Sequence, residues 1–418
     1  MHPRERWVAP GVRRRLGVEE TVLSRRQLLQ AGAGVALGAM LAGCSSTNPA
    51  ANIKGPPLPR QDNAVKWPLY GDNKAIASGL EPEQGATLQL YNWVAYINEA
   101  VIKNFSKKYN CNCQVTTYNT MEEALAKLSS GELKVDVFFP TVSVLGQLVT
   151  EKLIRPLNHS YIPNIANAWP DYLNPFYDQG WQYTTPYSIY TTGIAWRKDK
   201  VNLAPSWNMP WQAGRYSGKV AVLDDYRESL SLALLHGGHP DLNTTSEPAI
   251  RAAGRALQQL SSRTNVRIDN NDYTDVPTGK TWVHLAWSGD MALSNEYLPK
   301  GTSVDTIGYW FPPDHRGPVA NDLMVNLAGG DNPVLAHKFI DYMLDVDNAL
   351  ENFSYVGYQQ PLTGVTPQRL VSEKLLVPQL TSTVVREDYF RNGLFELELP
   401  PSTDALWEST WNGFSKGL

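Results

Sequence analysis

The chain has 418 residues, of which 42% are hydrophobic and 10% are aromatic. This length exceeds one typical domain of about 150 residues, so we expect two domains. Thirteen tryptophans and twenty tyrosines exclude intrinsic disorder, which requires a chain poor in apolar side chains. The formal net charge is −4 and no basic cluster follows the N-terminus, so no nucleic-acid partner is expected.

The first 44 residues have the pattern of a bacterial export signal. Ser24-Arg25-Arg26 resembles a twin-arginine motif, and an apolar stretch follows from Ala31 to Ala42. Leu41-Ala42-Gly43-Cys44 resembles a lipobox, whose cysteine carries the lipid. The apolar stretch is shorter than the roughly 20 residues that span a bilayer. We therefore expect residues 1–43 to be removed and the chain to be anchored to the membrane through lipidated Cys44.

Residues 44–86 are predicted to form a tether. They are rich in proline, asparagine, serine and glycine and lack an apolar period, which is typical of a linker. Ordered structure is therefore expected to begin at Thr87.

Cys111 and Cys113 are the cysteines that remain after Cys44. At positions i and i+2 of a strand their Cα atoms would lie about 6.6 Å apart, near the upper limit for a disulfide. We expect two small, partly buried thiols, with a strained disulfide as the alternative in an oxidising compartment. Because no histidine stands beside them, they make a poor metal site.

From Thr87 the chain alternates predicted strands and helices. The first block contains the segments Leu88–Tyr91, Ile97–Tyr109, Cys113–Tyr118, a helix capped by Asn119 or Thr120, Val135–Phe139 and Val142–Leu148. This order predicts an α/β fold with parallel strands covered on both faces. A second α/β block contains Val220–Leu223, Leu230–Leu235, Pro248–Leu260, Val283–Trp287, Pro333–Asp345 and Val346–Tyr355. Ligands of such sheets bind beyond the carboxyl ends of the strands.

Six segments, in this order and spacing, resemble the polyamine-binding proteins of bacterial ABC importers. They are Leu90–Tyr96, Asp136–Pro140, Tyr187–Ile194, Leu223–Glu228, Trp287–Gly289 and Val356–Tyr358. The resemblance covers about residues 87–366. It implies a two-lobe fold of the periplasmic-binding-protein type II, with the ligand in a cleft between the lobes. Lobe one would hold residues 87–192 and 321–368, and lobe two residues 193–320 and 369–418.

The resemblance also implies a function. The protein would be an extracytoplasmic receptor that delivers a spermidine- or putrescine-like polyamine to an ABC permease. It would be a monomer, would not be an enzyme, and would need neither cofactor nor metal.

A polyamine site needs carboxylates for the ammonium groups and aromatic faces between them. At the family's positions this chain has the aromatic residues Trp93, Tyr96, Trp287 and Tyr358 and the acids Asp225, Glu228 and Asp322. From the residues themselves, Asp225 and Glu228 are equally well explained as a helix-capping pair.

Several positions depart from the family pattern. Thr141 and Ser143 stand where the family has a different polar sequence, and Asp290 is an acid that the pattern does not require. Ala320 replaces an aromatic residue, for which Trp310 or Tyr309 is the candidate substitute. The ligand could therefore be another organic cation.

Two further functions compete with this prediction. A receptor of the same fold could bind ferric iron through Tyr187, Tyr190 and Tyr358. A secreted hydrolase could use Asp225 with Glu228, or Asp290, as its acid and base. The chain contains no Gly-x-Ser-x-Gly or His-Glu-x-x-His motif that would favour a hydrolase.

Overall fold

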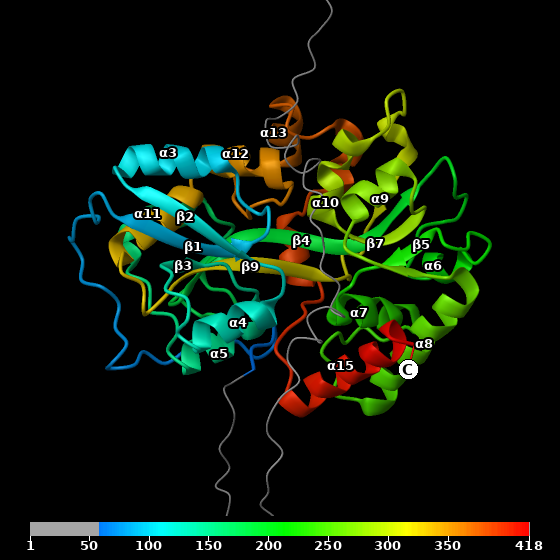
Figure 1. Cartoon of the computed structure of the whole chain (residues 1–418), viewed down its shortest axis with the longest axis horizontal. Helices are drawn as coiled ribbons and strands as arrows, with labels where there is room; N and C mark the ends of the chain where they lie inside the picture. Colours follow the sequence, from blue (N-terminus) through cyan, green and yellow to red (C-terminus); the bar gives the residue numbers. More distant parts are fainter. Residues whose placement is uncertain (1–57, 418) are drawn as a thin grey trace, which may run out of the picture. The chain divides into compact units, whose positions relative to one another are not determined.

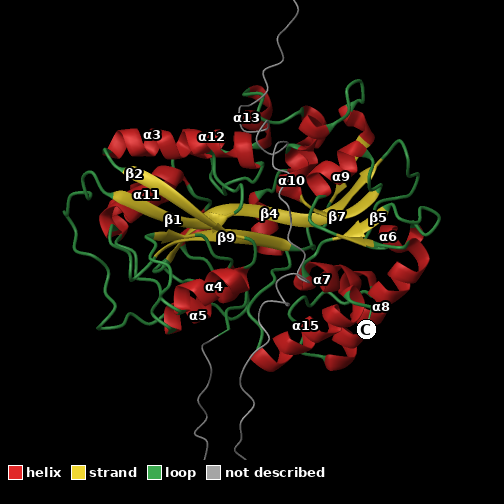
Figure 2. Ribbon diagram, viewed as in Figure 1, coloured by secondary structure: helices red, strands yellow, loops and turns green. Residues whose placement is uncertain are grey.

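A nine-stranded sheet runs through residues 58–417, the part of the chain that the computed structural model describes (Figure 1). Its strand order is β2-β1-β3-β9-β4-β7-β5-β6, and β8 pairs with β4. Helices cover both faces of the sheet (Figure 2). The predicted signal segment 1–43 and Cys44 lie outside the described residues.

The elements have the following bounds. The strands are β1 (Thr87–Trp93), β2 (Asn112–Tyr118), β3 (Val137–Phe138), β4 (Thr184–Arg197), β5 (Val220–Val222), β6 (Arg267–Ile268), β7 (Val283–Trp287), β8 (Ile307–Trp310) and β9 (Val319–Asn326). The α-helices are α3 (Glu99–Tyr109), α4 (Met121–Ser129), α5 (Leu145–Thr150), α6 (Met209–Gln212), α7 (Tyr226–His236), α8 (Glu247–Thr264), α9 (Asp272–Thr278), α10 (Ser288–Ala292), α11 (Pro333–Met343), α12 (Val346–Val356), α13 (Pro367–Ser372), α14 (Glu387–Asn392) and α15 (Pro401–Ser415).

The first block of the sheet is the predicted βαβ series. β1 pairs in parallel with β2 and β3, and β3 pairs antiparallel with β9. The helices begin at residues whose side chains accept a backbone N–H of the first turn: Asn98 caps α3 and Thr120 caps α4. Local capping chemistry therefore explains where these helices begin.

The long strand β4 connects the two halves of the sheet. Residues 184–191 pair antiparallel with β9, whereas residues 192–197 pair with β7 and β8. In the second half, β5 pairs in parallel with β6 and β7. This change of partner agrees with the lobe boundary predicted at residue 192. The bounds of the two lobes stay a prediction.

The C-terminal segment contacts both halves, although residues 369–418 were expected in lobe two. α15 packs on α7 and α8 of the second half. The Phe390 ring of α14 instead packs at a tilt on that of Tyr172, in the region assigned to lobe one, with 4.6 Å between ring centres. Burial of these aromatic rings keeps α14 in the first half, so the chain crosses again between α14 and α15.

Residues 58–86 pack onto the first half, in contrast to the tether expected there. Trp67 is 2% exposed, and its indole N–H donates to the backbone oxygen of Tyr177 at 2.8 Å. Arg60 donates to the backbone oxygen of Glu398 at 2.9 Å. Single side chains, rather than an apolar face, hold this segment in place, so its sequence shows no apolar period. The partners of these side chains lie far away in the chain.

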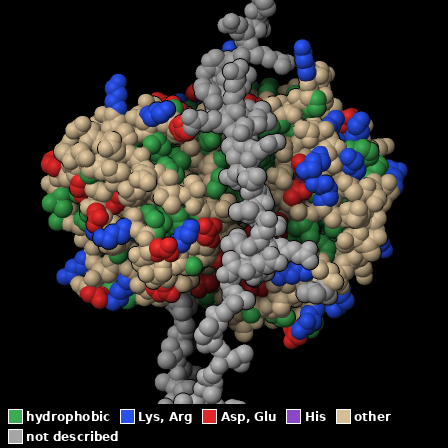
Figure 3. Space-filling model, in the orientation of Figure 1, with side chains coloured by type: hydrophobic (Ala, Val, Ile, Leu, Met, Phe, Trp, Pro, Cys, Tyr) green, Lys and Arg blue, Asp and Glu red, His purple; other side chains and the backbone are tan. Residues whose placement is uncertain are grey.

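The surface and the helices show two further features. Acidic and basic side chains are interspersed on the face in Figure 3. Within residues 58–417, no helix combines the length and the hydrophobicity that a membrane crossing requires.

Candidate ligand-binding site

Asp322 is a buried acid on β9, at the centre of the sheet. It is 3% exposed, and its Oδ2 accepts hydrogen bonds from Tyr96 Oη at 2.8 Å and Ser188 Oγ at 3.2 Å. Its Oδ1 has no hydrogen-bond partner among residues 58–417. Burial raises the pKa of Asp322 to about 7, and the two hydrogen bonds only partly oppose this shift. The ionised form therefore needs a cation.

Three tyrosine rings lie beside Asp322. The Tyr358 ring meets that of Tyr96 edge to face at 4.9 Å and that of Tyr190 at 5.4 Å. A Cβ atom at Gly289 would lie 2.4 Å from the Tyr358 ring, so glycine is required there. The ring faces can hold alkyl chains and ammonium groups by apolar and cation–π contact.

Tyr190 accounts for the departure at Ala320. The two residues are directly paired in the β4–β9 ladder, so their side chains share one face of the sheet. The Tyr190 ring thus lies beside the position where the family has an aromatic side chain. Tyr190 was predicted only as an iron ligand, because its pairing with Ala320 depends on long-range register.

Glu228 is a second buried acid, in the first turn of α7. Its Oε1 accepts hydrogen bonds from Trp287 Nε1 at 2.8 Å and Thr192 Oγ1 at 2.9 Å. Its Oε2 has no hydrogen-bond partner within the described range. Burial, followed by the nearby charges of Glu396 and Asp225, raises the pKa of Glu228 well above its usual value. Like Asp322, this carboxylate offers one oxygen to a cation.

Asp225 caps α7. Its Oδ1 accepts the backbone N–H groups of Arg227 at 2.9 Å and Glu228 at 3.0 Å. The capping interpretation is therefore confirmed, whereas the ligand contact expected from the resemblance stays a prediction. The side chain is half-buried, and burial raises its pKa.

Glu396 is an acid near this site that sequence analysis missed. It lies between Phe395 and Leu397, which are both buried, in the segment between α14 and α15. Burial raises its pKa to about 7; the Arg227 charge opposes the shift and the Asp225 charge adds to it. The alternation of apolar and acidic residues from 395 to 399 was the signal that could have found it.

Asp272 is a further acid that sequence analysis missed, at the start of α9. It is fully buried, and its Oδ2 accepts the backbone N–H of Trp287 at 3.0 Å. Burial, together with the nearby charge of Asp290, raises the pKa of Asp272 well above its usual value. The sequence Asn270-Asn271-Asp272 resembles an ordinary polar loop, so no local signal marks it. Asp290, predicted as an extra acid, thus lies near Asp272, which in turn binds the backbone of Trp287.

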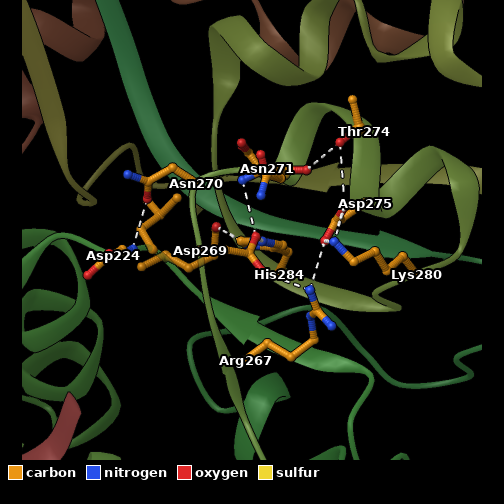
Figure 4. A network of polar contacts seen from close by, with 12 residues as sticks. Asp224, Arg267, Asp269, Asn270, Asn271, Thr274, Asp275, Lys280 and His284 are labelled. Atoms are coloured by element: carbon orange, nitrogen blue, oxygen red, sulfur yellow. Dashed lines mark hydrogen bonds and ion pairs between the residues drawn. The ribbon is translucent and has the colours of Figure 1, made fainter. Parts of the chain in front are cut away.

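The loop before Asp272 is held by the polar network in Figure 4. Buried His284 lies 3.4 Å from Asp269, and Asp269 also pairs with Arg267 at 3.1 Å. Lys280 pairs with Asp275 at 2.9 Å. The basic side chains of Arg267 on β6 and of Lys280 after α9 are therefore paired with acids other than Asp272.

Of the remaining predicted residues, Thr141 and Ser143 lie next to β9, whereas Trp93 lies against another aromatic ring. Thr141 forms a backbone bridge with Asp322, and its hydroxyl lies 2.8 Å from that of Ser143. Trp93 packs on Tyr118 at 4.6 Å between ring centres, and its buried indole N–H has no partner among residues 58–417.

Two residues were candidates to replace the aromatic side chain that the family has at the position of Ala320. Of these, Tyr309 rather than Trp310 lies near Glu228 and Asp272. Burial and the charges of Glu228 and Asp272 raise the pKa of Tyr309, whereas the Trp310 ring packs edge to face on Trp207 at 5.0 Å.

The acids of this site outnumber its bases. Arg227 is the buried base beside them, and it donates to neutral acceptors, the backbone oxygens of Leu397 and Leu242 and the side chain of Asn243. No group of three or more metal-ligating acids, histidines or cysteines occurs within residues 58–417. Buried acids around tyrosine rings, without matching bases, favour an organic cation.

Comparison with known proteins identifies the family. Residues 100–378 match the model of the bacterial extracellular solute-binding proteins. The chain belongs to this family. Its members bind solutes rather than catalyse reactions, so the family supports an extracytoplasmic receptor and not the hydrolase alternative.

Two curated relatives carry polyamine names. The putrescine/cadaverine-binding protein of Pseudomonas aeruginosa is 29% identical over 301 residues, covering 70% of this chain and 84% of the relative. The spermidine/putrescine-binding periplasmic protein of Escherichia coli is 28% identical, covering 74% of this chain and 86% of the relative. The resemblance found in the sequence is thereby confirmed.

Solved structures confirm the fold. The spermidine/putrescine ABC transporter substrate-binding protein PotD of Streptococcus pneumoniae has a TM-score of 0.66 at 23% identity, covering 80% of this chain and 99% of the other. The TpPotD lipoprotein of Treponema pallidum has a TM-score of 0.66 at 22% identity, covering 78% and 99%. The predicted type II periplasmic-binding fold is therefore correct.

Proposed function

We propose that this protein captures a polyamine outside the cytoplasm and delivers it to an ABC importer. The observation that carries the proposal is the pair of buried carboxylates, Asp322 and Glu228, each with one oxygen that lacks a partner among residues 58–417. They come from the two halves of the sheet, β9 and α7, and the tyrosine rings lie beside Asp322. The names of the relatives support the same class of ligand.

The two ends of a polyamine bind to different acids of the site. One ammonium group donates to Asp322 Oδ1 and another to Glu228 Oε2. Their positive charges balance the ionised carboxylates, which burial otherwise disfavours relative to the protonated acids. The alkyl chain between them packs on Tyr190 and Tyr358. Because each end is held by a different half, binding draws the halves together.

Calorimetry of the chain beginning at Ser45 tests the proposal. Putrescine and spermidine should release heat with one site per chain, and the recovered ligand should be unchanged. A neutral sugar and ferric ion are the controls. Binding of either control in place of both polyamines would overturn the proposal.

We also propose that Cys44 carries a lipid anchor after export through the twin-arginine route and that the receptor acts as a monomer. The sequence from Ser24 to Cys44 supports the first part, and a solved neighbour is itself named a lipoprotein. Cys44→Ala should move the protein from the membrane to the soluble fraction, and light scattering should give the mass of one chain. Unchanged membrane fractionation of the variant would contradict the anchor.

A further inference from the structure

The loop that carries Tyr96 has a strained backbone. Ala95 has a φ of 55°, in the left-handed region that residues other than glycine rarely adopt. This alanine lies between Trp93, at the end of β1, and Tyr96, whose hydroxyl donates to Asp322 at 2.8 Å. A non-glycine residue persists in this conformation only where the surrounding structure holds it. The contacts of the loop therefore decide whether the Tyr96 hydroxyl stays beside Asp322.

A buried hydroxyl group on the long strand β4 holds this loop. Tyr187 of β4 donates its hydroxyl hydrogen to the backbone oxygen of Tyr96. The same hydroxyl oxygen accepts a hydrogen bond from Asn352 Nδ2 on α12 at 3.1 Å. The Tyr187 ring also packs edge to face on that of Tyr96, with 5.3 Å between ring centres. Tyr187 thus contacts both the backbone and the ring of the residue that binds Asp322.

Asn352 fixes the other end of the loop. This side chain is buried, and its Oδ1 accepts the backbone N–H of Asn98 at 2.9 Å. Asn98 in turn caps α3, because its own Oδ1 accepts the backbone N–H of Ala100 at 2.9 Å. The amide of Asn352 thus bonds Tyr187 through its nitrogen and the start of α3 through its oxygen. Residues 96–98 are therefore held at both ends by neutral hydrogen bonds.

We propose that Tyr187 and Asn352 are positioning residues for ligand binding, which hold the strained loop so that the Tyr96 hydroxyl stays bonded to Asp322. Asp322 then keeps a hydrogen-bond donor on Oδ2 while an ammonium group of the ligand binds to Oδ1, which has no partner among residues 58–417. Tyr187 and Asn352 do not contact the ligand, and both act through Tyr96. This inference rests on the proposed polyamine ligand.

Tyr187→Phe tests the role of the hydroxyl group, because it keeps the ring. Calorimetry with the chain from Ser45 should show putrescine binding weakened about tenfold. Tyr183→Phe is the matched control: this buried tyrosine, just before β4, donates its hydroxyl to the backbone oxygen of Pro68 at 2.6 Å. The control should bind putrescine as the native chain does. Native affinity in Tyr187→Phe, or an equal loss in both variants, would overturn the inference.

A double-mutant cycle shows whether Tyr187 acts through Tyr96. Both hydroxyl groups belong to one series of contacts, so Tyr187→Phe should weaken binding little further once Tyr96→Phe is present. Glu228→Gln changes the other half of the sheet, and Tyr187→Phe should still cost about tenfold in that background. A merely structural Tyr187 would lower the affinity by the same factor in both backgrounds, which would overturn the inference.

The strained alanine allows a rescue experiment. Glycine adopts a positive φ at little cost, so Ala95→Gly should restore about two- to fivefold of the affinity that Tyr187→Phe loses. No recovery would overturn the role of the strained loop. Asn352→Asp serves if Tyr187→Phe does not fold, which thermal melting reveals. Its carboxylate can accept the Asn98 N–H but cannot donate to Tyr187, so a similar loss is expected and native affinity would overturn the inference.

The same titrations separate this inference from the proposed function. If the native chain gives no binding heat with putrescine or spermidine, the polyamine ligand itself is wrong. If the native chain binds putrescine and Tyr187→Phe binds it equally well, the positioning role is overturned while the receptor function stands.

Discussion

At the scale of single residues, the candidate site is built from acids that the fold itself does not neutralise. Asp322 and Glu228 keep one oxygen each without a partner among residues 58–417, although both lie inside the protein. A buried polar atom left without a hydrogen-bond partner costs about 1–3 kcal/mol. The protein therefore accepts a loss of stability at the positions that its ligand would occupy.

Asp322→Asn should weaken putrescine binding about ten- to a hundredfold. A hydrogen bond to a charged group contributes about 1.5–3 kcal/mol, and each 1.4 kcal/mol is a factor of ten in affinity. Titration calorimetry measures the change. Asp331→Asn makes the same substitution at an exposed acid after β9 and should leave the affinity unchanged. If the two variants bind equally well, Asp322 does not contact the ligand.

The same substitution should stabilise the ligand-free protein in a pH-dependent way. The pKa of Asp322 is about 7 in the folded protein and about 4 for an exposed aspartate, so the folded state binds this proton more tightly. The contribution of Asp322 to the free energy of unfolding therefore falls between about pH 4 and pH 7 and stays low above pH 7.

Urea unfolding of native and Asp322→Asn protein at two pH values measures this contribution. The variant should be more stable by about 1–3 kcal/mol at pH 8 and similar to the native protein at pH 4. A constant difference between the two proteins would show that Asp322 does not titrate in this range.

Residues of the site differ in how far sequence could identify them. Glu228 stands in a segment that resembles the family, and Asp322 matches an acid of the family outside those segments, so both positions were predicted. The places of Tyr190 beside Ala320 and of Asp272 beside Trp287 were not predicted, because one depends on strand register and the other on the packing of α9 against β7. Neither relation leaves a local pattern in the chain.

At the scale of elements, structure set by local chemistry could be predicted from the sequence, whereas structure set by long-range contacts could not. The helix α4 begins at Thr120, one of the two predicted caps, and the strands β1 and β2 lie where strands were predicted. The segment 58–86 was taken for a tether because its composition is that of a linker. Its order comes from Trp67 and Arg60, whose partners lie more than a hundred residues away.

Trp67→Ala should destabilise the protein by about 3–5 kcal/mol, the usual cost of removing a buried tryptophan side chain. The indole ring is 2% exposed, and its hydrogen bond to Tyr177 would also be lost. Denaturant unfolding measures the change. Leu69→Ala, two residues away at a side chain that is 62% exposed, should be nearly neutral. Equal stability of both variants would restore the tether interpretation.

The segment between α14 and α15 allows a matched comparison of two acids. Glu396→Gln should weaken spermidine binding about tenfold, because Glu396 lies near Arg227, Asp225 and Glu228. Glu398→Gln should not, since the Glu398 side chain lies instead against Gly146 and near Arg60. Calorimetry distinguishes them, and equal losses would mean that the segment acts only through its backbone.

At the scale of the whole molecule, the two halves of the sheet should move relative to each other when ligand binds. Small-angle X-ray scattering should show a smaller radius of gyration with saturating putrescine than without it. Asp322→Asn at the same putrescine concentration, chosen below the dissociation constant of the variant, should keep the ligand-free radius. An unchanged radius in the native protein at saturation would show that binding requires no closure.

The order of the strands also dictates how the protein can be made. β9 lies between β3 and β4, with Val137 paired to Asn326, so the ribosome must translate past residue 326 before the first half can complete its sheet. Every residue of β5 to β8 is synthesised in between. Folding is thus governed by contacts that are distant in the chain and therefore slow to form. A substitution that delays only β5 to β8 should consequently hold back the first half as well, leaving its strand edges exposed to aggregation.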